Sequence, residues 1–375
     1  MTQPSSDPDP SADDAAMAEA LALAANAIGL SDPNPRVGCV ISGRGGGIVG
    51  RGFTQAAGDA HAEVMALRDA AARGADVRRA TVHVTLEPCA HHGRTPPCAD
   101  ALIAAGVGRV VMAMRDPNPL VAGQGAARLQ AAGITVASGS GESEAAAREL
   151  NVGFVSRMER GRPWLRMKAA VSLDGRSALA DGSSQWITGE AARADGHAWR
   201  RRAGAVLTGV GTVLEDDPLL DVRHVATARQ PLRVVVDSRL ETPPSARLLE
   251  PPGEVLLYGA IDEAERRRAL EARGAEIALM PSPSGKVDLA AMLADLGARG
   301  INELHVEAGE KLNASLLQAG LVDELLVYVA PSLIGPGRSL AALAAIAGLD
   351  DRLQFTFTRV DRVGPDLRLL LRPVP

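Results

Sequence analysis

The sequence has few aromatic residues, few lysines and few cysteines, and each shortage excludes a class of protein. Aromatic residues make up 2% of the 375 residues, the formal net charge is −5 at pH 7, and lysine occurs only at Lys168, Lys286 and Lys311. Proteins that bind RNA or single-stranded DNA need a basic path and aromatic stacking platforms, so these numbers argue against a nucleic-acid-editing function. No apolar run approaches the roughly 20 residues that span a bilayer, so we expect no membrane partner.

The three cysteines, Cys39, Cys89 and Cys98, are too few for a disulfide framework in a chain of this size. Their number suits a reducing compartment, in which metal binding or catalysis explains any cysteine that matters. We therefore expect a cytoplasmic protein. Residues 1–14 are acidic and rich in Pro, Ser and Asp, without the basic start of a secretory signal, and they predict a disordered tail.

The length and the hydrophobic pattern predict two domains. Strands near residues 37–42, 48–53, 81–86, 109–114 and 134–137 alternate with predicted helices. The pattern fades over residues 156–163 and restarts with a strand near residues 165–173. We place one domain at residues 15–155 and another at residues 163–375, each with a layered α/β fold.

The strongest functional signal is a set of potential zinc ligands in the first domain. His61 and Glu63 lie at the start of a predicted helix, and Cys89 and Cys98 bracket the loop before another. Zinc binds neutral imidazole and thiolate in a tetrahedron, and a catalytic site keeps one of the four positions for water. Glu63 then lies close enough to move protons without being a ligand. This His-x-Glu and Pro-Cys…Cys pattern is typical of the zinc base deaminases.

A structural zinc site is the alternative for these residues. It would need a fourth protein ligand, which His91 or His92 could supply. The triplet that begins at His61 and ends at Glu63 has no purpose in a purely structural site, so we favour a catalytic metal centre. His83 lies within an apolar strand and is expected to be an ordinary core histidine.

The loop between the two cysteines points to one family of deaminases. Eight residues separate Cys89 from Cys98, whereas nucleoside and tRNA deaminases usually have two at this place. The loop Ala90-His91-His92-Gly93-Arg94-Thr95-Pro96-Pro97 resembles that of the riboflavin-biosynthesis deaminases. The segment Asn34-Pro35-Arg36-Val37-Gly38-Cys39-Val40 is similar to the substrate-binding segment of that family, and residues 116–119 and 123–125 are similar to a further segment.

Motifs in the second domain resemble the pyrimidine reductase of the same pathway. They are residues 168–175, 184–188, 209–212, 216–219 and 236–238. The chain therefore resembles the bifunctional riboflavin-biosynthesis deaminase-reductases from about residue 15 to its end.

This resemblance implies a cytidine-deaminase-like α/β/α fold for the first domain and a dihydrofolate-reductase-like α/β fold for the second. The implied reactions are hydrolytic deamination of 2,5-diamino-6-(5-phosphoribosylamino)pyrimidin-4-one by zinc hydroxide, then reduction of the ribosyl group to ribityl with NADPH. The implied cofactors are one Zn²⁺ per deaminase domain and NADPH. The implied partner is a small-molecule phosphoribosylaminopyrimidine substrate.

The resemblance also implies roles for individual residues. Asn34 is expected to contact the deaminase substrate. Independently of the resemblance, the metal pattern makes Glu63 catalytic, and Lys168, the only lysine before residue 286, is expected to be catalytic by orienting or polarising the sugar. The residues expected at NADPH are Ala170, Trp186, Thr212, Asp216, Ser238, Gly309, Glu310, Lys311, Leu312, Asn313, Ala314 and Ser315. The residues expected at the reductase substrate are Ser184, Arg200, Leu220, Arg223 and Glu307. A helix that opens at Gly309 offers free backbone N–H groups to a phosphate, and two arginines can clamp another.

Two positions depart from the family pattern. Thr54 stands where many relatives have histidine, and Ala308 stands where a second glycine is common, so one substrate contact and the cofactor affinity could differ. The sequence leaves open another function, which is deamination of a different nitrogen heterocycle beside an inactive reductase-like domain. It does not fix the oligomeric state, and a homo-oligomer stays open.

Overall fold

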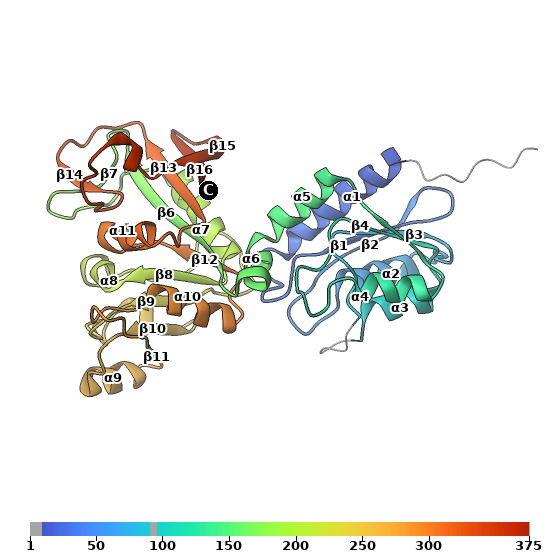
Figure 1. Ribbon diagram of the computed structural model, residues 1–375, viewed down its shortest axis with the longest axis horizontal. Helices are drawn as coiled ribbons and strands as arrows, with labels where there is room; N and C mark the ends of the chain where they lie inside the picture. The colour runs from blue at the N-terminus through green and yellow to red at the C-terminus, as the bar shows by residue number, and fades with distance from the viewer. Residues whose placement is uncertain (1–9, 91–95, 375) are drawn as a thin grey trace, which may run out of the picture. The chain divides into compact units, whose positions relative to one another are not determined.

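The chain divides into two compact units, residues 1–161 and residues 162–375 (Figure 1). The structure is a computed structural model, and it describes residues 10–90 and 96–374. Within these residues no helix is both long and apolar enough to cross a membrane. The boundary between the units falls inside residues 156–163, where the sequence pattern fades.

The described part of the first unit contains a mixed sheet with the strand order β2-β1-β3-β4-β5. β1 pairs antiparallel with β2 and β3, whereas β3, β4 and β5 run parallel. The strands are β1 Gly38–Ser42, β2 Ile48–Phe53, β3 Thr81–Val84, β4 Arg109–Met112 and β5 Thr135–Ser138. The parallel strands bring the ends of β3 and β4, and the loops that follow them, to one edge of the sheet.

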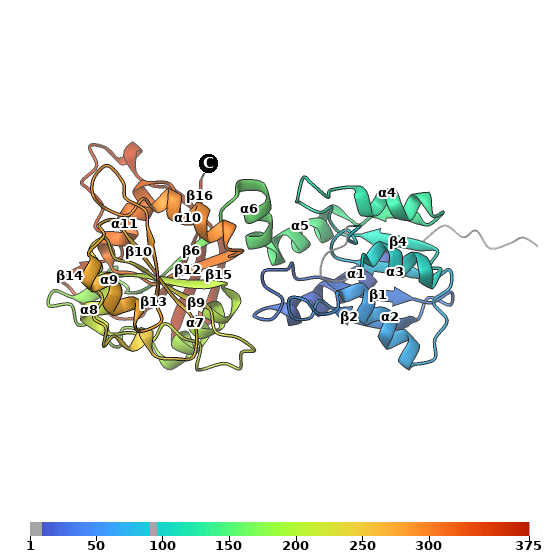
Figure 2. The same ribbon diagram turned by 90° about the horizontal axis from the view of Figure 1, so that it is seen from below.

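Helices cover both faces of this sheet. α1 and α5 lie on one face, and α2, α3 and α4 lie on the other (Figures 1 and 2). The helices are α1 Pro10–Ala24, α2 Ala62–Ala72, α3 Cys98–Ala105, α4 Gln124–Ala131, α5 Gly141–Leu150 and α6 Val152–Arg160, with a short 3₁₀ turn at Ala25–Ala27. The predicted α/β/α arrangement of the first domain is confirmed.

The predicted disordered tail is too long, because α1 begins at Pro10. Asp13 accepts two hydrogen bonds from Arg109, at 2.8 and 2.6 Å, and lies 2.8 Å from Nε2 of His83. These contacts with two strands of the sheet hold the start of the helix, and sequence composition alone does not reveal them. His83 is buried, as expected for a core histidine. Residues 1–9 lie outside the described residues.

Close backbone contact seats α2 on β2. Ala62, Ala66 and Ala70 form one buried face of the helix, four residues apart. Opposite them a Cβ at Gly52 would come within 2.3 Å of the Ala62 carbonyl oxygen, and one at Gly50 within 2.4 Å of the Ala66 oxygen. The glycines and alanines therefore let the helix that begins after His61 approach the sheet at backbone distance.

The second unit is built on a larger sheet with the order β11-β10-β9-β8-β12-β6-β13-β16-β15 in the described residues. The strands from β11 to β13 in this order are parallel, and the hairpin of β15 and β16 continues the sheet antiparallel. The strands are β6 Trp164–Ser172, β7 Arg176–Leu179, β8 Ala205–Gly209, β9 Leu232–Val236, β10 Val255–Gly259, β11 Glu276–Leu279, β12 Glu303–Val306, β13 Glu324–Ala330, β14 Gly337–Ser339, β15 Phe355–Val363 and β16 Asp366–Pro373, of which β7 and β14 form a separate pair.

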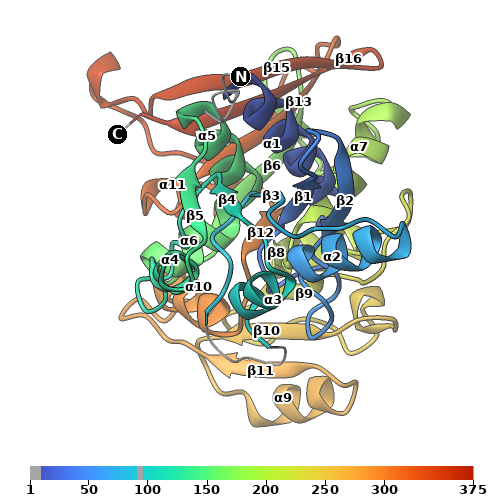
Figure 3. The same cartoon turned by 90° about the vertical axis from the view of Figure 1, so that its right-hand side faces the viewer.

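The two faces of this sheet differ in chemistry. α10 and α11 pack Leu293, Leu316 and other apolar side chains on one face, which carries Leu165 and Leu304. α7 lies on the opposite face (Figure 3). The helices are α7 Glu190–Arg202, α8 Val210–Asp216, α9 Ala264–Glu271, α10 Leu289–Ala298 and α11 Glu310–Gln318, with 3₁₀ turns at Arg247–Leu249 and Leu349–Asp351.

A buried charged layer lies between α7 and the sheet. The Arg166 side chain is 2% exposed and makes ion pairs with Glu303 at 2.7 Å and Glu324 at 2.5 Å. Its guanidinium lies 4.4 Å from the ring centre of Trp199 on α7. Because side chains alternate along a strand, Arg166 and Lys168 share one face of β6. The sheet face beneath α7 is therefore polar and charged, in contrast to the apolar face beneath α10 and α11.

Candidate functional site

The predicted zinc ligands meet in the first unit. Nδ1 of His61 and the sulfurs of Cys89 and Cys98 all lie within 4.8 Å of one another, and this is the only such cluster found among the described residues. The His61 nitrogen lies 3.7 Å from the Cys89 sulfur and 3.3 Å from the Cys98 sulfur. A tetrahedral zinc ion with Zn–S of about 2.3 Å holds neighbouring ligand atoms about 3.5–3.8 Å apart, so the three side chains fit zinc.

The fold explains why these three side chains converge. His61 is the residue before α2, and Cys98 is the first residue of α3. The N–H of Cys98 donates to the Cys89 sulfur at 3.3 Å. Hydrogen bonding by the Cys98 side chain, His61 and that N–H lowers the pKa of Cys89 to about 4. The lowered pKa favours the thiolate form of Cys89, which is the form that binds zinc.

Glu63 lies one residue into α2 and is buried. Burial raises the pKa of its carboxyl, and the negative charge of Cys89 raises it further. A buried carboxyl with a raised pKa beside a metal site is suited to accept a proton and then release it. A neighbouring cavity of about 760 Å³ opens at His61 and is lined by Gln55, Asp59, Val64 and Arg68 among others.

Glu87 is a site residue that the sequence reasoning missed. Its buried carboxylate accepts three backbone hydrogen bonds, from Asp116 at 3.2 Å, Gly123 at 2.9 Å and Ala126 at 3.1 Å. It thereby ties the segment that resembles a family motif, residues 116–125, to the loop after β3 that carries Cys89. The sequence offered one signal for Glu87, which is its position two residues before the metal ligand Cys89. Its hydrogen-bond partners lie 29 to 39 residues away in the chain, so the sequence alone does not reveal them.

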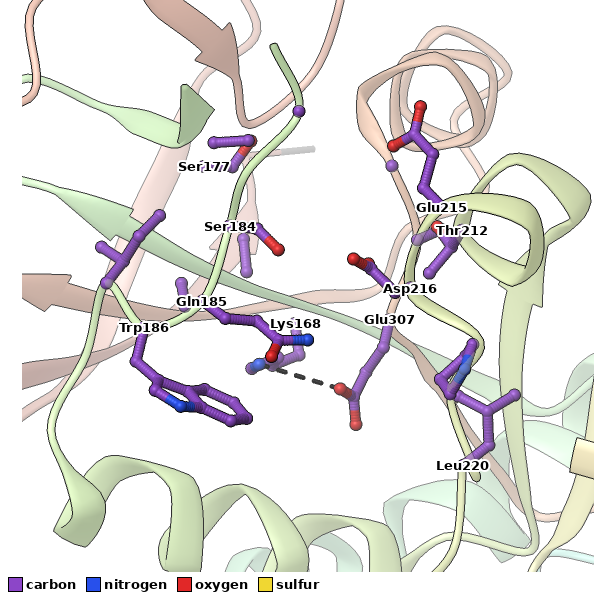
Figure 4. A pocket seen from close by; sticks show the side chains of 18 of the residues that line it. Lys168, Ser177, Ser184, Gln185, Trp186, Thr212, Glu215, Asp216, Leu220 and Glu307 are labelled. Atoms are coloured by element: carbon purple, nitrogen blue, oxygen red, sulfur yellow. Dashed lines mark ion pairs between the residues drawn. The ribbon is translucent and has the colours of Figure 1, made fainter. Parts of the chain in front are cut away.

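The second unit has a cavity of about 490 Å³ at the carboxyl ends of its parallel strands. Figure 4 shows Ser184, Gln185 and Trp186 on one side of it and Thr212, Asp216 and Leu220 on the other. Ligands of open parallel sheets bind at this end of the strands. An overlapping cavity of about 490 Å³ extends along α7 and is also lined by His197, His224 and Tyr328.

A carboxylate held by cations lies at the bottom of the cavity. Glu307 follows β12 and accepts two hydrogen bonds from Arg200, at 2.5 and 3.0 Å, while Nζ of Lys168 lies 3.8 Å away (Figure 4). Burial raises the pKa of Glu307, but the charges of Arg200 and Lys168 outweigh it and leave the pKa well below its usual range. Glu307 therefore stays ionised and holds both cations at the cavity.

Most of the predicted reductase residues lie together. Lys168 and the five predicted substrate residues, Ser184, Arg200, Leu220, Arg223 and Glu307, all line the cavity. So do seven of the predicted cofactor residues, Ala170, Trp186, Thr212, Asp216, Gly309, Glu310 and Asn313. The other five, Ser238, Lys311, Leu312, Ala314 and Ser315, are not among its lining residues. Trp186 is 66% exposed, so its side chain is open to a ligand in the cavity.

The cavity offers features suited to a phosphorylated cofactor. Gly309 precedes α11 and no side chain caps that helix, so its first N–H groups are available to a phosphate. A Cβ at Gly309 would meet the Thr212 hydroxyl at 3.7 Å, an ordinary van der Waals distance. Ala308 lines the same cavity, and its methyl group is therefore close to any ligand there.

Two positions singled out in the first unit, Asn34 and Thr54, are not among the residues that line the cavity at His61. Asn34 is half-buried, and its backbone pairs with Ser31. Thr54 is buried, with its hydroxyl 3.5 Å from the Val37 carbonyl. His91 and His92, considered above as a possible fourth metal ligand, lie outside the described residues.

The fold and the two sites define a class: a zinc-dependent deaminase unit joined in one chain to an α/β reductase unit. Residues 10–114 match the family model of the cytidine and deoxycytidylate deaminase zinc-binding region. Residues 163–369 match the model of the RibD C-terminal domain. Together the two matches reach from near the start of α1 to the last strand.

Full-length relatives extend this match over the whole chain. It is 48% identical over 368 residues to the riboflavin biosynthesis protein RibD of Escherichia coli (strain K12), covering 95% of this chain and 98% of that protein. The solved structure of Acinetobacter baumannii RibD is 41% identical with a TM-score of 0.90, covering 98% of this chain and 100% of that one. A Thermotoga maritima diaminohydroxyphosphoribosylaminopyrimidine deaminase/5-amino-6-(5-phosphoribosylamino)uracil reductase is 32% identical with a TM-score of 0.87, covering 97% and 99%.

The chain belongs to the RibD family of bifunctional riboflavin-biosynthesis enzymes. The predicted fold, with a deaminase domain followed by a reductase domain, is confirmed. Zinc and NADPH, the cofactors expected from the sequence, are those of this family, and the enzyme acts on a small-molecule substrate.

Proposed function

We propose that the first unit deaminates 2,5-diamino-6-(5-phosphoribosylamino)pyrimidin-4-one and that the second reduces the ribosyl group of the product. The observation that carries this proposal is the presence, in one chain, of a His/Cys/Cys cluster beside a buried carboxyl and of a cavity with Lys168 and Glu307 at its base. The name of the Thermotoga relative supports the choice of substrate.

In the deaminase unit, His61, Cys89 and Cys98 would hold zinc. Bound zinc would supply a water whose pKa is lowered towards neutrality. Glu63 would take the proton of the attacking water and pass it to the ring nitrogen and then to the departing ammonia. The buried position of Glu63 supports this role, because no bulk water competes for the proton. Glu87 would keep the loop that carries Cys89 in place.

In the reductase unit, bound NADPH would supply a hydride to C1′ of the ribosyl group. The bond between C1′ and the ring oxygen opens in this step, and the oxygen takes up a proton. Nζ of Lys168 would donate that proton, with Glu307 holding the ammonium group at the cavity. Arg200 and Arg223 would bind the substrate phosphate, and Asp216 and the start of α11 would contact the cofactor.

A homo-oligomer in the cytoplasm is the state that we propose for the enzyme. β15 lies at the edge of the large sheet and exposes Phe357 and Val360, which makes it a surface suited to a second copy. None of the three cysteines, Cys39, Cys89 and Cys98, forms a disulfide, which supports a reducing compartment. Sedimentation of the purified enzyme tests the oligomer, since a monomer at micromolar concentration would contradict it.

A coupled assay tests the two proposed activities together. The purified enzyme is given the diaminopyrimidinone substrate with zinc and NADPH, and ammonia release and NADPH oxidation are followed in one sample. We expect both signals, with NADPH oxidation dependent on prior deamination. Ammonia without NADPH oxidation would refute the reductase assignment, and absence of both signals would refute the substrate.

A further inference from the structure

The reductase cavity has one wall whose backbone is held by side chains. Leu220, which lines the cavity, has a left-handed backbone with φ of 53°, and residues 221–223 follow it. Nη1 of Arg200 donates to the Asp221 carbonyl at 2.8 Å. The Gln230 amide binds both the N–H and the carbonyl of Val222, at 2.8 and 2.9 Å. Side chains from α7 and from a later loop position therefore fix the backbone that leads to Arg223.

A further contact to this backbone comes from His197, a residue without a role in the reaction steps proposed for the reductase unit. The backbone N–H of Arg223 donates to Nδ1 of His197 at 3.3 Å. His197 lies on α7 between Arg193 and Arg200, at spacings of four and three residues, so the three side chains share one face of the helix. All three line the cavity along α7. His197 therefore connects the helix to the backbone of a predicted substrate residue.

The surroundings of His197 keep its ring uncharged. The residue is 5% exposed, and the ring of His224 packs against it edge to face with centroids 4.5 Å apart. Burial, and then the charges of Arg200, Arg223 and His224, lower the pKa of His197 to about 4, although Glu307 opposes them. Because Nδ1 accepts a hydrogen bond, the proton of the neutral ring is on Nε2.

We infer that His197 is a positioning residue of the reductase site, whose Nδ1 holds the Arg223 backbone in the place from which Arg223 reaches the substrate phosphate. This inference rests on the proposed reductase activity. Arg223 itself ends in an exposed guanidinium paired with Asp221 at 2.5 Å, so its side chain alone does not fix its position. The hydrogen bond from the Arg223 backbone to His197 restricts the motion of the Arg223 guanidinium, and this lowers the conformational entropy lost when phosphate binds.

Three variants separate the hydrogen bond from the volume of the ring. In His197→Asn the side-chain oxygen takes the place of Nδ1. In His197→Gln the polar end instead reaches the place of Nε2, and in His197→Phe the ring volume stays without an acceptor. If Nδ1 is what matters, asparagine rescues the site and the larger glutamine and phenylalanine do not. A role in filling space predicts the opposite order.

Steady-state kinetics with the deaminated substrate give the first readout. For His197→Gln and His197→Phe we expect the KM for this substrate to rise about tenfold, the upper range for one hydrogen bond. The KM for NADPH and kcat should stay within about twofold, and His197→Asn should lie within about threefold of wild type. An equal rise in both KM values, or a worse result for asparagine than for phenylalanine, would overturn the inference.

Hydrogen exchange of residues 221–224 gives a second readout that does not depend on activity. We expect the Arg223 amide to exchange about tenfold faster in His197→Phe than in wild type, and at nearly the wild-type rate in His197→Asn. Unchanged exchange in His197→Phe would overturn the positioning role. A wild-type enzyme that oxidises no NADPH would instead refute the proposed function, and the exchange result would still report on the anchor.

Discussion

Replacing Glu63 by glutamine removes the proposed proton carrier while keeping the size of the side chain. General acid–base catalysis contributes about 10²–10⁴-fold to a rate, which corresponds to about 3–5 kcal/mol of activation free energy. Glu63 is 3% exposed, so bulk water cannot easily replace its carboxylate. We therefore expect the deamination rate of Glu63→Gln to fall by about 10³–10⁴-fold, the upper part of that range.

The assay for Glu63→Gln measures ammonia release together with the zinc content of the purified protein. The zinc ligands are untouched, so one zinc per chain should remain, and NADPH oxidation with the deaminated substrate should keep the wild-type rate. Glu159→Gln is a matched control, because Glu159 lies in the same unit in an exposed pair with Arg148. A zinc-loaded Glu63→Gln enzyme within tenfold of wild type would refute the proton-transfer role.

Four further predictions concern both units. Lys168→Ala should lower NADPH oxidation by about 10²-fold or more and leave ammonia release unchanged, and equal loss of both would contradict its assignment. Arg166→Met should lower the free energy of unfolding of the reductase unit by about 3 kcal/mol, because it leaves Glu303 and Glu324 buried with fewer partners; an unchanged melting temperature in calorimetry would argue against this. Glu87→Ala should weaken zinc binding about 10–100-fold in a chelator competition, and unchanged affinity would remove its supporting role. The folded-state pKa of His197 is about 4, below the ordinary value of 6.5, so the unfolded chain binds more protons between these values. The reductase unit should therefore lose stability as pH falls from 6.5 to 4, and His197→Asn should flatten that slope in pH-dependent denaturant unfolding.

The zinc site could be predicted because its signal is local. His61 and Glu63 are two residues apart, and Cys98 begins a helix nine residues after Cys89, so short motifs carry both the ligand types and their spacing. The alternation of strands and helices likewise indicated two α/β domains. The weak hydrophobic pattern over residues 156–163 was interpreted as a domain boundary, yet residues 156–160 belong to the helix α6. The buried residues of this helix, Val155 and Ser156 among them, stand beside charged residues in the sequence, which obscures the helical pattern.

The residues that sequence reasoning missed are those whose partners lie far along the chain. Glu87 binds backbone groups that follow β4, and Asp13 binds side chains of β3 and β4. His197 sits in an arginine-rich helix that resembles a solvated surface helix, and only the return of the chain at Arg223 gives it a partner. No spacing rule connects such pairs, since their proximity comes from packing of the sheet and helices.

The close packing of α2 on Gly50 and Gly52 of β2 restricts which sequence changes the deaminase unit can accept. A side chain at either glycine would push the helix outward as a rigid rod, and His61 and Glu63 at its start would move with it. The positions of the metal ligand His61 and of the proton carrier Glu63 therefore depend on the packing of α2 against β2. We expect changes of substrate specificity to arise in the loops around α2 and β2, and these loops are therefore the place to redesign specificity.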